Sequence, residues 1–263
     1  MKKYKNLLLE TNGPVLKVIL NRASKGNAVN KETSTELMDL FTQLRYEPDI
    51  HFVVITGQGR FFTTGQDMPE LFEGPKALPE VRAYQLDGNE LTRKLQDLEQ
   101  ITIAAINGPM IGGGLALAIA CDFRVMDSEA WTSLPEAQMG YFFTWGSTPR
   151  LVSLVGASKA KELIMLCDRI DANEAFRIGL VDKVAPSGQV DAVVEEMLTK
   201  LKSSPFLPIR LTKKIVNSLE TTAVGNITVF EPELHQGANL TGIPQEGMQK
   251  LIDGFKNKNK KIV

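Results

Sequence analysis

The feature of this sequence that most constrains the fold is a stretch from Gln100 to Cys121 without a single charged residue. Its length alone would suffice for a helix across a lipid bilayer. However, Asn107-Gly108-Pro109 and Gly112-Gly113-Gly114 interrupt the stretch, and a broken backbone that faces lipid would leave polar groups unpaired. We therefore predict no membrane segment here, and we interpret the stretch as a buried strand, a tight loop and a buried helix.

The same succession of strand, loop and helix recurs along most of the chain. Strands are predicted at Leu7–Thr11, Val15–Leu20, Phe52–Thr56, Ile101–Ile106 and Phe123–Met126, the first two forming a hairpin around Asn12-Gly13-Pro14. Helices are predicted at Thr33–Leu44, capped by Asn30, and at Glu80–Leu98 and Leu115–Cys121. Continuous apolar strands are typical of parallel sheets that are covered on both faces, so the pattern predicts an α/β fold.

The strands end near Val190, and the remainder of the chain is predicted to be mainly helical. Helices are expected at Val190–Lys202, Ile209–Leu219, around Val229–Asn239 and at Gln245–Phe255. Ser203-Ser204-Pro205 is the best candidate for a boundary. We therefore predict a core at residues 1–203 and a C-terminal helical region at residues 204–263.

Composition restricts the class of ligand. The chain has 263 residues and a formal net charge of -1 at pH 7, so it lacks the excess positive charge that would favour a nucleic-acid partner. Its two cysteines, Cys121 and Cys167, lie in apolar stretches and fit a reducing cytoplasm better than a disulfide framework. His51 and His235 lack the spacing of metal ligands or of a nucleophile–base pair, so no metal site is predicted.

Two glycine-containing loops suggest chemistry on an oxygen atom. A buried helix that begins at Gly112-Gly113-Gly114 offers unpaired N–H donors and the positive end of its dipole, which suit developing negative charge. The loop Phe61–Asp67 also follows a buried strand, and Gly65 would allow a turn that presents the N–H of Gln66. Two such donors are what a thioester oxygen needs when it becomes an enolate. Close packing of strand, loop and helix is the structural alternative.

These motifs, with their neighbours, resemble the crotonase family, the enoyl-CoA hydratases and isomerases. The resemblance rests on five ordered blocks: Leu20–Asn30, Phe61–Met68, Ile103–Val125, Leu134–Gly140 and Asp168–Val184. It implies an acyl-CoA substrate and a crotonase-like spiral of strand-strand-helix turns, followed by helices that form homotrimers, often paired into homohexamers. It also implies that the N–H groups of Gln66 and Gly113 bind the thioester oxygen, while Asp67 shapes its loop.

The family's hydratases carry two glutamates around the substrate's double bond, and this sequence departs from that pattern. Glu136 matches the second glutamate, whereas Ala116 stands at the position of the first. Adding water usually requires two carboxylates, but one suffices to move a double bond, because the same group removes and returns a proton. The resemblance therefore favours isomerisation of a 3-enoyl-CoA to a 2-enoyl-CoA, with Glu136 as the single acid/base.

Three alternatives remain open at this point. Glu136 alone could hydrate an unusual enoyl-CoA, with the backbone or Tyr141 helping to place water. The enolate could instead serve another reaction, such as decarboxylation. Finally, Ala116 would also fit a CoA-binding homologue that has lost catalysis.

The contacts to CoA are less clearly encoded. The lysine that relatives often carry two residues after Asp67 is Pro69 here. Arg22 and Lys25 in the early loop, together with Lys256 from the last helix of a neighbouring subunit, are the remaining candidates for the phosphates. Tyr141 is a polar candidate near the acyl group. No cofactor is predicted beyond the CoA that the substrate carries.

Overall fold

The computed structural model describes residues 2–73, 78–228 and 231–259. Within its helices, the side chains of residues 72–73, 78, 81, 220–228, 251–252 and 254–259 lie outside this description. No helix of the described part is both long and apolar enough to cross a membrane.

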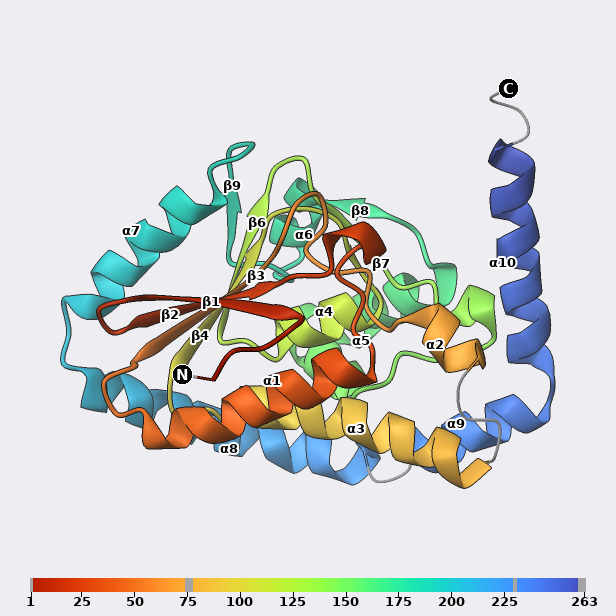
Figure 1. Cartoon of the computed structure of the whole chain (residues 1–263), viewed down its shortest axis with the longest axis horizontal. Helices are drawn as coiled ribbons and strands as arrows, with labels where there is room; N and C mark the ends of the chain where they lie inside the picture. The colour runs from red at the N-terminus through yellow and green to blue at the C-terminus, as the bar shows by residue number, and fades with distance from the viewer. Residues whose placement is uncertain (1, 74–77, 229–230, 260–263) are drawn as a thin grey trace.

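A six-stranded sheet forms the centre of the molecule (Figure 1). Strands β1 (Leu7–Asn12) and β2 (Val15–Leu20) pair antiparallel, which confirms the predicted hairpin. Strands β3 (Phe52–Gly57), β4 (Ile101–Ile106), β6 (Phe123–Asp127) and β9 (Lys183–Ala185) then add in parallel, in the order β1-β2-β3-β4-β6-β9. The predicted α/β pattern with parallel strands is therefore confirmed.

Alternate residues of the sheet enter two separate cores, which explains the continuous apolar runs of its strands. Val53 and Ile55 of β3 belong to a large core shared with α1 (Lys31–Gln43), α3 (Leu78–Gln96) and α4 (Gly113–Ile119). Phe52 and Val54 face the opposite way, into a smaller core with α7 (Val190–Lys202). Figure 1 shows α7 on one side of the sheet and α1 and α3 on the other.

A second, small sheet was not predicted. It consists of β5 (Met110–Ile111), β7 (Trp131–Ser133) and β8 (Ile170–Asp171). With two or three residues each, these strands are too short to produce a recognisable alternation of apolar and polar residues. The sheet matters for function because β5 leads directly into α4, so it fixes where α4 begins.

The remaining helices are α2 (Met68–Glu73), α5 (Ser147–Leu166), α6 (Ala172–Arg177), α8 (Phe206–Thr228), α9 (Glu231–Leu240) and α10 (Ile243–Asn259). Helix α7 ends at Lys202 and α8 begins at Phe206, so Ser203-Ser204-Pro205 separates two helices, and the division into a core and a C-terminal region stays a prediction. Beyond it, α8 packs on α5 and α7, α9 packs on α3, and α10 packs on the short 3-10 turn Ala137–Met139. Figure 1 shows α10 at the edge of the molecule.

Candidate active site

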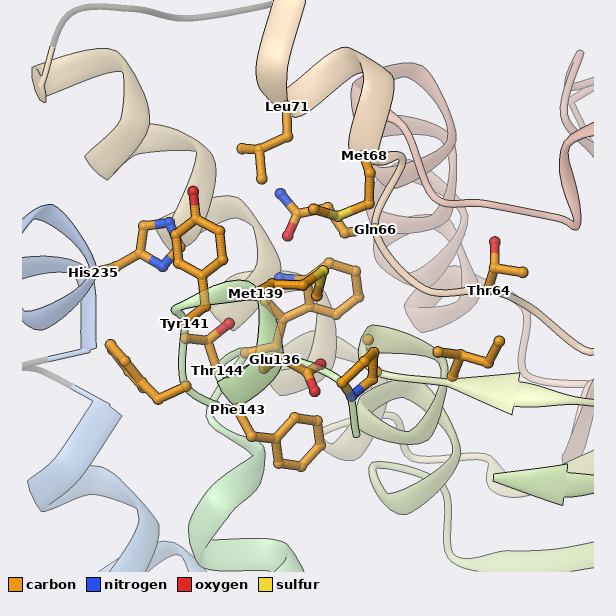
Figure 2. Close-up of a pocket in the computed structure, with 16 residues that line it drawn as sticks. Thr64, Gln66, Met68, Leu71, Glu136, Met139, Tyr141, Phe143, Thr144 and His235 are labelled. Atoms are coloured by element: carbon orange, nitrogen blue, oxygen red, sulfur yellow. The ribbon is translucent and has the colours of Figure 1, made fainter. Parts of the chain in front are cut away.

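A cavity of about 130 Å³ lies where three segments of the large core meet. The loop between β3 and α2 contributes Gln66, the junction of β5 and α4 contributes Gly112 and Gly113, and the segment after β7 contributes Glu136. Figure 2 shows Glu136 in the middle of this group of side chains. The cavity wall is otherwise largely apolar, with Met68, Leu71, Ile111, Met139, Phe142, Phe143 and Trp145.

The backbone around Gln66 is fixed on both sides. Gly65 adopts a left-handed φ of 79°, as the sequence predicted for a turn at this position. Its carbonyl accepts a hydrogen bond from Val29 N at 2.7 Å, and the N–H of Asp67 donates to Val29 O at 3.0 Å. Because the residues before and after Gln66 are paired with Val29, the Gln66 N–H points away from that pairing.

Gly112 and Gly113 form the start of α4, two residues earlier than predicted from the sequence. The Gly112 N–H donates to Ser133 O of β7 at 3.0 Å, so the second sheet holds this turn in place. Gly112 has a φ of 51°, a left-handed conformation that favours glycine. Gly113 is the first helical residue, and its N–H is therefore one of the donors that a helix cannot satisfy internally.

The two N–H groups lie beside each other. A Cβ atom on Gly65 would lie 2.7 Å from Gly113 N, and one on Gly113 would lie 3.3 Å from Gln66 N. Ile111 N also donates to Thr63 O at 3.1 Å, which joins the two loops. In the described part of the chain, neither the Gln66 N–H nor the Gly113 N–H donates a hydrogen bond. Two free donors at a helix N-terminus can stabilise negative charge that develops on one oxygen atom.

Glu136 places its carboxylate against this helix start. A Cβ atom on Gly112 would lie only 2.5 Å from Glu136 Oε1, so the carboxylate occupies space that only a glycine leaves free. Its Oε2 is buried and has no hydrogen-bond partner. Burial raises the pKa of Glu136 to about 7. Of the described residues that line the cavity, Glu136 is the one carboxylate.

Trp145 packs against Gly113 and belongs to a loop that is held by hydrogen bonds to two helices. It has a left-handed φ of 60°, and its carbonyl accepts a hydrogen bond from Thr92 Oγ1 at 2.6 Å. The next N–H, of Gly146, donates to Glu231 Oε2 at 2.8 Å. Glu231 is 2% exposed, and burial raises the pKa of its carboxyl group. Helix α9 therefore holds the loop that closes one wall of the cavity.

His235, also from α9, lines the cavity, and sequence reasoning missed this position. Its ring stacks on Tyr141, with centroids 4.5 Å apart and an angle of 3° between the planes. Burial lowers the pKa of His235 to about 4, so the ring is neutral near pH 7. One local signal was present, because Glu231 and His235 are four residues apart and share a face of their helix.

The residues predicted to contact substrate lie in different surroundings. Arg22 Nη1 donates to Asp67 Oδ2 at 2.8 Å, and Asp67 Oδ1 accepts from the N–H of Glu70 at 3.3 Å. Lys25 is exposed, on a short turn beside the Thr64 end of the loop. Neither Arg22, Lys25 nor Asp67 lines the cavity, and a role for them in CoA binding stays a prediction.

Tyr141 does line the cavity, but its hydroxyl group donates to Asn239 Oδ1 at 3.0 Å. Burial raises its pKa to about 12, so the hydroxyl keeps its proton near pH 7. Lys256, the remaining prediction, belongs to α10, and its side chain lies outside the described residues. Among the side chains that the structure describes, no group of three or more His, Cys, Asp or Glu is suited to a metal ion.

Ala116, the position at which the sequence departs from the hydratases, is fully buried in the large core. It lies one turn into α4 and is not among the residues that line the cavity. The cavity wall therefore has no second carboxylate from this helix.

Comparisons with known proteins identify the family of the chain. The family model for enoyl-CoA hydratase/isomerase matches residues 10–260. The chain is 33% identical over 259 residues to the short-chain-enoyl-CoA hydratase of Clostridium acetobutylicum, with 96% of this chain and 98% of that protein covered. It is also 33% identical to the crotonyl-CoA hydratase of Syntrophomonas wolfei, with 95% of this chain and 96% of that protein covered.

Solved structures give the same result at the level of the fold. An enoyl-CoA hydratase structure from Bacillus anthracis matches with a TM-score of 0.79 and 30% identity, and covers 98% of this chain and 97% of that one. An enoyl-CoA hydratase/isomerase from Mycobacterium paratuberculosis matches with a TM-score of 0.85 and 25% identity over 93% of this chain and 98% of that one. The expected crotonase-like α/β fold is thereby confirmed, and the chain belongs to the enoyl-CoA hydratase/isomerase family of enzymes.

Proposed function

We propose that this protein isomerises a 3-enoyl-CoA to the conjugated 2-enoyl-CoA, with Glu136 as the single acid/base. The observation that carries the proposal is the composition of the cavity wall. Glu136 is the one carboxylate among its described residues, and it lies against the glycine turn that provides the N–H donor of Gly113.

The proposed reaction consists of two proton transfers. The ionised carboxylate of Glu136 takes a proton from the carbon next to the thioester carbonyl, and the electron pair moves onto the thioester oxygen as a dienolate. The N–H groups of Gln66 and Gly113 stabilise this oxygen. Glu136 then returns the proton to the carbon two positions further along the chain, so the double bond moves and no other reactant is consumed.

The surroundings of Glu136 support this role. A base works best when its pKa lies near the operating pH, and burial raises the pKa of Glu136 to about 7. Its Oε2 has no partner within the described protein and is free to take up a proton. The apolar wall excludes water, which would otherwise weaken the interaction of the N–H groups with the enolate.

The test is to follow the absorbance of the conjugated thioester when the protein is mixed with 3-hexenoyl-CoA. We expect turnover by the wild type and a loss of about 100-fold or more in Glu136→Gln, the scale typical of a removed general base. Glu129→Gln is the matched control, since Glu129 is an exposed carboxylate outside the cavity. Equal turnover by wild type and Glu136→Gln would refute the assignment of Glu136.

Hydration of a 2-enoyl-CoA is the second candidate, because relatives with 33% identity are named as hydratases. In this reaction Glu136 would have to activate water without a partner carboxylate from α4. Mass spectrometry of the products separates the two candidates, since isomerisation leaves the mass unchanged and hydration adds one water. A gain of one water from 2-hexenoyl-CoA, without isomerisation of 3-hexenoyl-CoA, would favour the hydratase.

The proposal includes several further properties. The enzyme needs no cofactor beyond the CoA of its substrate, and Arg22, Lys25 and Lys256 are the candidates to contact that CoA. It works in the cytoplasm, a location supported by its two free cysteines, Cys121 and Cys167. It assembles as a homotrimer or homohexamer, which is tested below.

A further inference from the structure

His235, a residue of the cavity wall, has a buried polar atom without a partner among the described residues. The side chain is 3% exposed and lines the same cavity as Glu136, and its Nδ1 is buried without a hydrogen-bond partner among the described residues. A buried polar atom without a partner destabilises a protein by about 1–3 kcal/mol, so it calls for an explanation. The proposed double-bond shift does not use this atom.

The position of the ring is fixed by its other contacts. One face stacks on Tyr141, and Nε2 lies 3.2 Å from the side-chain amide nitrogen of Gln85 on α3. Tyr141 is held in turn by Asn239, one helical turn after His235. These contacts leave Nδ1 as the atom of the ring that is available to a ligand.

The neighbouring Gln85 restricts the chemistry of that ligand. If its amide nitrogen donates to Nε2, then Nδ1 of the neutral ring carries the proton and acts as a donor. If the amide is turned so that the unpartnered Oε1 of Gln85 accepts from Nε2–H, then Nδ1 is an acceptor. A hydroxyl group pairs with Nδ1 in either case, because it can both donate and accept.

A charged ligand group is disfavoured at this wall. Burial lowers the pKa of His235 to about 4, so the ring carries no charge near pH 7. Among the described residues of the cavity wall there is no lysine or arginine, which a ligand carboxylate would require for compensation. Thr144 and Tyr141 are polar but uncharged.

The location of His235 indicates which part of the acyl chain would carry the hydroxyl group. In Figure 2, His235 and Thr64 lie on opposite sides of the cavity, and Glu136 lies between them. Gln66, whose N–H is a proposed donor to the thioester oxygen, lies between Thr64 and His235 in this view, and His235 lies at the edge of the group. An acyl chain that starts at the Gln66 N–H and passes Glu136 therefore reaches His235 with its far end.

We infer that the acyl group of the substrate carries a hydroxyl group distant from the thioester, and that this hydroxyl hydrogen-bonds to Nδ1 of His235. The inference rests on the proposed function, because it takes an acyl-CoA as the ligand of this cavity. It makes His235 a residue that determines specificity and leaves the proton transfers to Glu136.

The test uses saturated thioesters, which bind without reacting. Calorimetry would compare hexanoyl-CoA with an analogue that carries a hydroxyl group at the sixth carbon of the acyl chain, because thioesters with a hydroxyl group at the fourth or fifth carbon cyclise to lactones and release CoA. We expect the wild type to bind the hydroxylated analogue about 10-fold more tightly than hexanoyl-CoA. If the hydroxylated analogue does not bind more tightly than hexanoyl-CoA, the inference is overturned.

Two variants locate the contact. His235→Phe keeps an aromatic ring on Tyr141 and should abolish the preference without weakening the binding of hexanoyl-CoA by more than about 3-fold. His235→Asn keeps a polar atom near the position of Nδ1 and should retain part of the preference. His51→Phe is the control, since His51 stacks on Phe206 outside the cavity. If His235→Phe folds and keeps the full preference, the assignment to His235 is wrong.

The outcomes also separate this inference from the proposed function. If the protein isomerises 3-hexenoyl-CoA but shows no preference for a hydroxyl group, only the inference fails. If a hydroxylated thioester binds more tightly but no 3-enoyl-CoA is isomerised, the proposed function fails and the contact with His235 stands. If neither thioester binds, both are refuted.

Discussion

Ionisation of Glu136 has opposite effects on stability and on the proposed reaction. The charged carboxylate lies in a largely apolar wall, and this burial raises its pKa to about 7. The same environment leaves its Oε2 without a hydrogen-bond partner. The protein therefore stabilises the charged form of Glu136 poorly, and this favours uptake of a proton from the substrate. An ion pair or a hydrogen bond from a backbone N–H would stabilise the charged carboxylate, and this would make Glu136 a weaker base.

Burial of Glu136 should make the stability of the protein depend on pH. Between pH 4.5, the ordinary pKa of a glutamate, and about pH 7, the folded protein keeps a proton on Glu136 that the unfolded chain has lost. The free energy of unfolding should therefore fall as the pH rises through this range, and the loss is complete above pH 7. Glu136→Gln removes the titration, so it should be more stable than the wild type at pH 8 by on the order of 3 kcal/mol.

The measurement is urea denaturation of the wild type and Glu136→Gln at pH 5 and pH 8. The difference between the two proteins should grow with pH, and Glu129→Gln should show no such growth because Glu129 is exposed. A constant difference across this range would mean that Glu136 is not buried as described. The same titration predicts that isomerase activity rises with pH up to about 7, since only the ionised carboxylate acts as a base.

Two substitutions of Gly113 should show whether its N–H stabilises the enolate. Proline is tolerated at the first position of a helix, which Gly113 occupies, but it removes the N–H group. Gly113→Ala keeps that N–H and introduces a Cβ atom at 3.0 Å from the ring of Trp145. Gly113→Pro should therefore be about 100-fold less active than Gly113→Ala, the typical loss for one oxyanion donor.

Comparing alanine with proline separates the donor from the effect of added volume. Circular dichroism and thermal unfolding of both variants would verify that α4 still forms. Similar activities in the two folded variants would exclude the Gly113 N–H as a donor to the enolate.

At the scale of elements, the cavity depends on a helix that lies late in the chain. Helix α9 supplies both the His235 ring in the cavity wall and the Glu231 carboxylate that binds the N–H of Gly146. Because Gly146 follows Trp145, this contact connects α9 to the loop that packs against Gly113, and Tyr141 of the same loop also contacts His235 and Asn239 of α9. The loop has little regular structure of its own between Gly140 and Gly146, so its shape depends on such contacts.

Replacing either of two glutamates of α9 should have different effects on stability. Glu231→Ala leaves the Gly146 N–H buried and unpaired and should destabilise the protein by about 2–3 kcal/mol. It should also lower turnover, because the Trp145 wall shifts. Glu233 is 48% exposed and pairs with the exposed Arg82, so Glu233→Ala should cost less than about 1 kcal/mol.

Thermal unfolding and turnover of 3-hexenoyl-CoA would be measured for both variants. Equal losses in Glu231→Ala and Glu233→Ala would show that the contact between α9 and the loop is unimportant. A stability loss in Glu231→Ala with unchanged turnover would restrict this contact to a purely structural role.

Some helices and strands could be predicted from local patterns in the sequence, and others could not. The hairpin, the parallel strands and α1 with its Asn30 cap follow from local patterns, and the structure has all of them. Helix α5 was not predicted, because Pro149 lies in its first turn and Gly156, at a φ of 77°, interrupts its regular backbone. Strands of two or three residues, such as β5 and β8, are defined by their partners in space and not by a periodic pattern.

The residues of the candidate site also differ in whether the sequence alone could identify them. Gln66, Gly113 and Glu136 were named from short motifs and a family resemblance, and the structure brings all three to one cavity. His235 could not be named, since its position in the wall depends on the packing of α9. Arg22 was named as a phosphate contact, but its pairing with Asp67 becomes visible only in the folded chain.

At the scale of the whole molecule, one helix presents a large apolar surface to solvent. Four residues of α8, spaced four apart, form a stripe along it: Leu207, Leu211, Ile215 and Leu219, with exposures of 54%, 46%, 64% and 74%. Residues at this spacing lie on the same side of a helix. A folded protein rarely exposes such a stripe unless another surface covers it.

The last prediction is that this stripe lies in the interface of a homotrimer or homohexamer. Light scattering at micromolar concentration should give three or six times the chain mass of 29.0 kDa. Ile215→Glu places a charge on the stripe, where desolvation in an interface would be costly, and should shift the protein toward smaller species. Thr199→Glu adds the same charge to an exposed position of α7, away from the stripe, and should leave the mass unchanged. Because Ile215 is already 64% exposed in the single chain, Ile215→Glu should not disturb the fold of the protomer, and a smaller mass with unchanged circular dichroism would assign the effect to assembly. A wild type that remains monomeric, or an Ile215→Glu variant that keeps the full assembly, would contradict this role for α8.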